Sequence, residues 1–137
     1  KQEQLIPVKD FSIDKTQWKQ EIQRAYGPAA PGVLSLEERI GKNSQEEVRR
    51  RTEAFLKNKE RIWEIIEELP DAEKIINVLK SMEAPFYPEQ IQVSPEVFKH
   101  GIFYAKDLRN RFGLLQILFD FGLQEEFADR LINEVYR

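Results

Sequence analysis

The chain has 137 residues, 41% hydrophobic and 33% charged, a composition typical of a folded domain and not of a disordered segment. Its formal net charge of -3 argues against DNA or RNA as a partner, because neutralising phosphates requires a basic excess. The absence of cysteine excludes disulfides and thiol chemistry and fits a cytoplasmic location, and the chain has no apolar run of the roughly 20 residues that span a membrane.

The first part of the chain predicts two short helices. One is expected to begin near Asp14, a residue suited to cap it, and to end at Gly27 and Pro28. The other is expected over residues 32–40. Residues 1–12 precede any helical pattern, and we expect them to join the domain to an upstream part of the protein.

The strongest helical periodicity lies in residues 43–70 and predicts one long amphipathic helix that ends at a proline. Ser44 followed by Glu47 forms the pattern of a capping box at its start. Trp63 belongs to the apolar face, and we expect it to fill the core, as does Trp18. The other apolar positions are Val48, Thr52, Phe55, Ile62, Ile66 and Leu69.

The middle of the chain predicts a helix, an ordered loop and another helix. Asp71 is placed to cap the first of these helices. The loop contains two prolines and is expected to pack through Phe86 and Tyr87. Ser94 and Pro95 mark the next helix start, with proline at its favoured first position.

The last part of the chain predicts a break at residues 110–113 followed by two helices. The apolar stretch closed by Gly122 is expected to be the central helix of the domain, and residues 124–137 to form the last helix. No stretch alternates apolar and polar residues as a strand does. We therefore expect an all-α helical bundle in which residues 1–137 form a single domain.

The residues suited to catalysis are few. His100 is the only histidine and is interpreted as a helix-surface or interface residue, because nothing near it in the sequence would orient it as a base. The glycines form neither a dinucleotide fingerprint nor a P-loop. We therefore assign no catalytic, cofactor-binding or metal-binding residue to this chain.

Two groups of arginines are candidate anion ligands. The run at residues 49–51 is surrounded by glutamates, so we interpret it as a solvated helix face. Arg109 and Arg111 lie beside an apolar helix and are candidate cleft or corner residues. They are suited to bind a carboxylate or phosphate, or else to hold the corner by pairing with Asp107 or Asp120.

Several short motifs resemble one enzyme family. They are Ala84, Pro85, Pro88, Glu89 and Ile91, then residues 104–112, then Asp120, Gly122, Leu123, Phe127, Ala128 and Asp129, and upstream Trp18, residues 26–30, Asn43 and Ser44. These residues resemble the C-terminal end of the bacterial sn-glycerol-1-phosphate dehydrogenases, a branch of the iron-containing alcohol dehydrogenase and glycerol dehydrogenase superfamily. The resemblance implies the distal part of a dehydroquinate synthase-like helical domain.

The resemblance also implies a function for a larger parent enzyme. That enzyme would reduce dihydroxyacetone phosphate to glycerol 1-phosphate for phospholipid metabolism, with NAD(P) and with zinc or nickel held by one aspartate and two histidines. The nucleotide site and the metal ligands have no counterpart in this chain. The expected partner is therefore the missing nucleotide-binding and metal-bearing part, the chain alone is expected to be inactive, and a homodimer remains open.

Two alternatives belong to other functional classes. A self-standing helical module would act without catalysis by presenting an apolar groove to a protein partner. A ligand-binding bundle would use the neighbourhood of Phe86, Tyr87 and Arg111 as its pocket. An uncovered apolar face would favour the enzyme fragment over a self-standing module.

Overall fold

The computed structural model describes residues 12–136, which contain helices and no strand, so the predicted all-α class is confirmed for this range. The elements are α1 (Lys15–Tyr26), η1 (Gly27–Ala29), α2 (Ala30–Ile40), α3 (Gln45–Lys57), α4 (Lys59–Glu67), α5 (Ala72–Ser81), η2 (Pro88–Ile91), α6 (Pro95–Tyr104), η3 (Ala105–Leu108), α7 (Leu114–Asp120) and α8 (Gln124–Val135), where η denotes a 3₁₀ turn. The expected join at residues 1–12 lies outside the described residues except for Ser12.

Three helices begin at the caps that the sequence predicts. Asp14 Oδ1 accepts hydrogen bonds from the amides of the first turn of α1. Ser44 Oγ accepts from the Glu47 amide at 3.3 Å at the start of α3, and Ser94 Oγ accepts from the Val97 amide at 3.3 Å at the start of α6. The capping box at Ser44 is only half formed, because the Ser44 amide donates to the Gly41 carbonyl instead of the Glu47 side chain.

The prediction of one long helix over residues 43–70 is wrong. The chain forms α3 and α4, which are separated at Asn58, where φ is -109° and ψ is 14°. The Asn58 side chain donates to the Ala54 carbonyl at 2.7 Å. An asparagine that bonds to the local backbone competes with the helical hydrogen bonds, which explains the break at this position.

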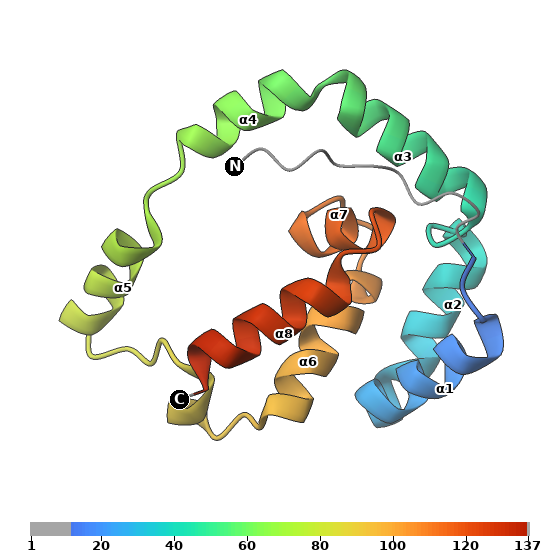
Figure 1. Cartoon of the computed structure of the whole chain (residues 1–137). Helices are drawn as coiled ribbons and strands as arrows, with labels where there is room; N and C mark the ends of the chain where they lie inside the picture. The colour runs from blue at the N-terminus through green and yellow to red at the C-terminus, as the bar shows by residue number, and fades with distance from the viewer. Residues whose placement is uncertain (1–11, 137) are drawn as a thin grey trace.

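The helices pack around two groups of buried side chains. Ile22, Ala30 and Val33 form one group between α1 and α2, and Trp18 packs against it as expected. The other group joins α3 to the end of α7, where the rings of Phe55 and Phe121 meet edge to face at a centroid distance of 5.4 Å. In Figure 1, α6 and α8 lie side by side below α7.

Only the C-terminal half of helix α7 lies in the core. Leu118 and Phe119 are buried, whereas Leu114 at the first turn is 61% exposed. The predicted break at residues 110–113 precedes it, and Gly122, with φ of +67°, follows its C-terminus. The prediction that this stretch is the central helix of the domain is therefore wrong for its N-terminal turn.

The loop before α6 is ordered as predicted but packs less deeply. Gln90 Oε1 accepts from the amides of Phe86 and Tyr87, both at 2.8 Å, and thereby closes the turn that leads into η2. The two aromatic rings contact each other at a centroid distance of 4.7 Å. Tyr87 remains exposed, so this pair covers only part of its own apolar surface.

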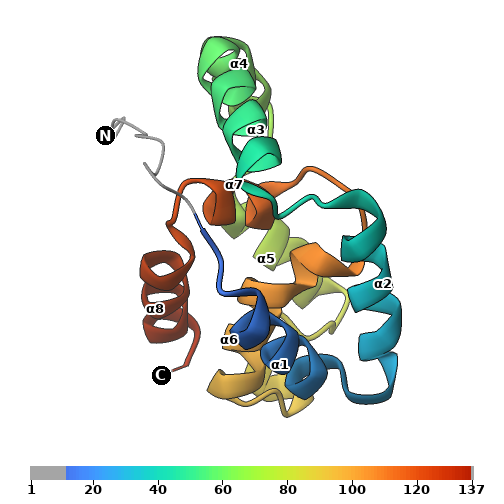
Figure 2. The same ribbon diagram turned by 90° about the vertical axis from the view of Figure 1, so that its right-hand side faces the viewer.

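Helices α4 and α5, with the connecting residues 68–71, form an arm that curves away from the other helices (Figures 1 and 2). No residue of either helix is buried. The large apolar side chains that the arm and its C-cap leave exposed are Trp63, Ile65, Ile66, Leu69, Ile75, Val78 and Met82. The expectation that Trp63 fills the core is therefore wrong, because its side chain is 37% exposed and α4 has no buried residue. None of the helices in that range is long and apolar enough to cross a membrane.

Candidate functional site

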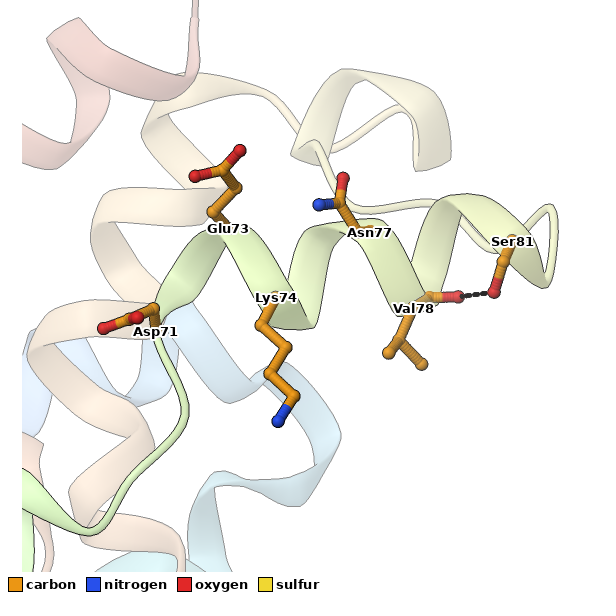
Figure 3. Close-up of a pocket in the computed structure, with 6 residues that line it drawn as sticks. All are labelled: Asp71, Glu73, Lys74, Asn77, Val78 and Ser81. Carbon is orange, nitrogen blue, oxygen red and sulfur yellow. Dashed lines mark hydrogen bonds between the residues drawn. The ribbon is translucent and has the colours of Figure 1, made fainter.

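One hollow of about 460 Å³ lies along the arm and is not a convincing site. Figure 3 shows that its lining residues all come from α5 or from Asp71 at its N-cap. The dashed line marks the bond from Ser81 Oγ to the Val78 carbonyl, which lies within the helix. A single helix face without an opposing wall cannot exclude water from a ligand, so we looked to the junction of α2, α3 and α7.

A network of buried polar groups is centred on Asp107 in η3. Its Oδ1 accepts from Lys106 Nζ at 2.8 Å and from Asn43 Nδ2 at 2.8 Å. Its Oδ2 accepts from Trp18 Nε1 at 3.2 Å, and Lys42 Nζ lies 3.9 Å from Oδ1. The carboxylate therefore joins α1, the turn after α2 and η3 at one buried point.

Both lysines of this network are buried, and hydrogen bonds within the protein already engage the ammonium group of each. Lys42 Nζ donates to the carbonyls of Lys106 and Arg109. Lys106 Nζ donates to Asn43 Oδ1 as well as to Asp107, and lies 3.8 Å from the centre of the Phe119 ring. Burial lowers the pKa of both lysines from the usual value, while the Asp107 carboxylate opposes this change. The network is a structural junction.

A second buried ion pair joins α3 to α7. Arg51 donates from Nε and Nη2 to the two oxygens of Asp120, and Gln116 Nε2 donates to Asp120 Oδ1 at 2.9 Å. The interpretation of residues 49–51 as a solvated face is therefore wrong for Arg51. It holds for Arg49 and Arg50, which are exposed.

The two arginines singled out from the sequence are both exposed, and neither pairs with an aspartate in the way considered. Asp107 is engaged by lysines and Asp120 by Arg51. Arg109 contributes its carbonyl oxygen, which accepts from Lys42 Nζ at 3.0 Å. The Arg111 side chain makes no hydrogen bond or ion pair within residues 12–136.

Arg111 faces α3 across a cavity of about 390 Å³, which we call the cationic pocket. Its walls come from the end of α2 and the turn after it, from α3, and from α7 with the segment that leads into it. The charged and amide residues that define it are Lys42, Glu47, Arg50, Arg51, Asn110, Arg111 and Gln116, with Ile40 and Phe112 beside them. The structure thus brings Arg111 together with two residues of the 49–51 run. Phe86 and Tyr87, which were considered with Arg111 as a ligand pocket, do not line it.

Comparison with known proteins identifies no relative. No known protein family, curated protein or solved structure matches this chain. The site must therefore be interpreted from its own geometry. Within residues 12–136, no three histidine or acidic side chains are grouped so that they could hold a metal ion. His100 lies half-buried on α6, with its ring 6.0 Å from that of Tyr104.

The buried ion pair between Arg51 and Asp120 was not predicted, although the sequence contains a signal for it. Arg51 lies three residues after Val48 and four before Phe55, so helical spacing places it on the apolar face of α3. Asp120 interrupts an otherwise apolar stretch. A charge inside an apolar pattern predicts a buried partner of opposite sign, because an unpaired charge there would be strongly destabilising.

Proposed function

We propose that this chain is the C-terminal helical portion of a cytoplasmic NAD(P)-dependent sn-glycerol-1-phosphate dehydrogenase. In that role it is not catalytic by itself. It supports the substrate cleft of a parent enzyme that reduces dihydroxyacetone phosphate to glycerol 1-phosphate. The fold we propose for it is the distal part of a dehydroquinate synthase-like C-terminal domain.

The observation that supports this proposal is the uncovered apolar surface of the α4–α5 arm. Leu69 and Met82 are 63% and 70% exposed, respectively, and α5 makes at most marginal contact with any other element of the described chain. Contiguous apolar surface of this kind marks a contact with another protein part. In a parent enzyme, the missing nucleotide-binding and metal-bearing part would cover it.

The cofactors of the family do not fit the residues of this chain. Zinc or nickel held by one aspartate and two histidines would require a second histidine, and His100 is the only one present. The chain also has no glycine-rich phosphate loop. We therefore place the NAD(P) and metal sites in the missing part and derive no reaction step from the residues described here.

The experiment that tests this proposal is the mass of the native polypeptide that carries the segment, captured from source cells with an antibody. A mass far above 16.2 kDa supports a parent enzyme, which is then assayed with dihydroxyacetone phosphate, NAD(P)H and added zinc or nickel. Turnover that requires both the nucleotide and the metal is the expected result. A large parent without this activity contradicts the dehydrogenase assignment.

A second candidate function is a self-standing helical interaction module, which the uncovered arm favours less than the enzyme portion. In this case the arm would bind an apolar partner through α4 and α5. A native mass near 16.2 kDa favours the module over the enzyme portion. Purification from source cells at low salt and analysis of co-purifying chains then identifies whether a protein covers the arm.

A further inference from the structure

We infer that two copies of this chain associate by docking the arm of one copy on a basic corner of the other. The contact on the arm is its bend, residues 63–71, where α4 ends and the connection to α5 follows. The contact on the other copy is the corner, residues 108–114, which connects η3 to α7. The inference goes beyond the dehydrogenase assignment, because it uses neither substrate nor cofactor. It leaves the apolar side of α5 to the missing part of a parent enzyme or to another partner.

The bend carries negative charge that the described chain does not neutralise. It includes four acidic residues and no basic residue. Glu67, Glu68 and Asp71 are exposed and make no ion pair in the described chain. Helical spacing places Glu67 next to Trp63 and Glu68 next to Ile65, so the carboxylates flank apolar side chains.

The bend also exposes apolar surface between these carboxylates. Leu69, which is 63% exposed, protrudes furthest into solvent of the apolar side chains there. Two bends are poorly suited to cover one another, because their unpaired carboxylates would meet, and like charges in an interface are costly. A partner for the bend therefore needs apolar surface together with positive charge.

The corner has both of these properties. Leu108, Phe112 and Leu114 are at least half exposed. Arg109 and Arg111 are exposed, and neither side chain makes a hydrogen bond or an ion pair in the described chain. The corner contains no acidic residue. It therefore complements the bend in charge and in apolar character.

A hollow in the corner is suited to a protruding apolar side chain. Its volume is about 270 Å³, and its lining includes Leu108, Arg109, Arg111 and Leu114. Pockets for small molecules begin at roughly 300 Å³, so the size favours a side chain over a free ligand. Leu69 is suited to the hollow, because it is exposed and has unpaired carboxylates near it that the two arginines can bind.

The corner that receives the bend belongs to a second copy. Within the described chain, neither α4 nor α5 makes more than marginal contact with η3 or α7. Figure 1 shows that the arm curves away from the other helices. A reciprocal exchange of arms covers both bends and both corners of two copies, and this arrangement is a closed dimer.

The test is a charge swap measured by sedimentation velocity of the full chain. We expect the wild-type chain to form a dimer whose fraction rises with protein concentration. The bend is reversed by Glu67→Lys with Glu68→Lys, and the corner by Arg109→Glu with Arg111→Glu. Either reversal should raise the dissociation constant of the dimer at least about tenfold, because like charges then meet. A mixture of the two variants should associate like the wild type, because each bend then meets a corner of opposite charge.

Glu53→Lys with Glu134→Lys is the matched control. Both glutamates are exposed and make no ion pair in the described chain, and this variant changes the net charge as much as the bend reversal does. The control should dimerise normally. Urea denaturation should give unchanged unfolding midpoints for all variants, because every substituted side chain is exposed and unpaired in the described chain.

Four results would overturn the inference. They are a wild-type chain that is monomeric at every concentration, a reversed variant that dimerises normally, a mixture that does not associate, and a control that loses the dimer as the bend reversal does. None of them bears on the dehydrogenase proposal, which is tested separately by the mass and the activity of the native polypeptide.

Discussion

The Arg51 guanidinium holds the Asp120 carboxylate by two hydrogen bonds, from Nε to Oδ2 at 2.6 Å and from Nη2 to Oδ1 at 2.7 Å. The two side chains are 11% and 1% exposed and join α3 to α7. Each charge has lost most of its hydration and depends on the other for compensation. Arg51 also lines the cationic pocket, so the ion pair that stabilises the fold fixes one of the side chains that shape the pocket.

Arg51→Gln should destabilise the chain by about 3 kcal/mol, because it leaves the Asp120 carboxylate buried without its counter-charge. The measurement is the free energy of unfolding from urea denaturation followed by circular dichroism. Arg50→Gln is the control, since Arg50 is exposed and its ion pair with Glu47 lies on the surface of α3. An Arg51 variant with the same midpoint as the Arg50 variant would show that the α3–α7 pair does not stabilise the fold.

Asp107→Asn should destabilise the chain by roughly 3 kcal/mol or more, because Lys42 and Lys106 would remain buried without their shared carboxylate. Adding Lys106→Met to this variant should recover part of the loss, since it removes one of the two uncompensated charges. The double-mutant cycle, measured by urea denaturation, should give a coupling energy of about 1 kcal/mol or more. Additive effects of the two substitutions would argue against a coupled network.

Glu37→Gln should change how stability depends on pH. Burial raises the pKa of Glu37 above 4.5, the hydrogen bond from the Asn43 amide opposes this, and Oε2 is buried without a partner in the described chain. A carboxyl group with a raised folded pKa binds its proton more tightly in the folded state. The wild-type chain should therefore lose stability relative to the glutamine variant as pH rises from 4.5 through the folded pKa.

The measurement for Glu37 is the difference in unfolding midpoint between the two proteins from about pH 4 to about pH 7. Because glutamine does not titrate, this difference isolates the carboxyl group. A constant difference over this range would mean that Glu37 has the same pKa in the folded and unfolded states. A difference that changes in favour of glutamate at higher pH would mean that the folded pKa is lowered.

The parts of the fold that could be predicted from the sequence depend on local interactions. Asp14, Ser44 and Ser94 cap helices through bonds to amides two or three residues away, so their role can be inferred from sequence alone. The all-α class follows in the same way from apolar periodicity. The break at Asn58 was not predicted, because apolar spacing continues across it and does not reveal that the asparagine side chain donates to the Ala54 carbonyl.

The parts that could not be predicted depend on what packs against a helix. Trp63 lies on an apolar face with helical spacing, yet it is 37% exposed, and α4 contacts little of the described chain beyond α3. Arg50 and Arg51 are adjacent and chemically identical, but only Arg51 meets Asp120 across 69 residues of chain. The cationic pocket likewise joins Arg111 to α3, and one sequence without its tertiary contacts does not reveal that proximity.

The apolar surface of the arm should control the association of the isolated chain. Replacing Leu69 and Val78 together with serine should reduce binding of a hydrophobic dye and reduce self-association, because both side chains are exposed and unpacked. The unfolding midpoint should change little, since the substitutions remove no buried contact. The measurements are dye fluorescence, sedimentation velocity and urea denaturation.

Phe55→Ala is the control for the arm variant. Phe55 is buried against Phe121, so its truncation should cost about 3–5 kcal/mol and should increase dye binding by loosening the fold. The two variants should therefore move dye binding in opposite directions. If the arm variant instead lowers the unfolding midpoint as Phe55→Ala does, then α4 and α5 pack onto the body in solution. In that case the arm would not be available to the partner that we propose for it.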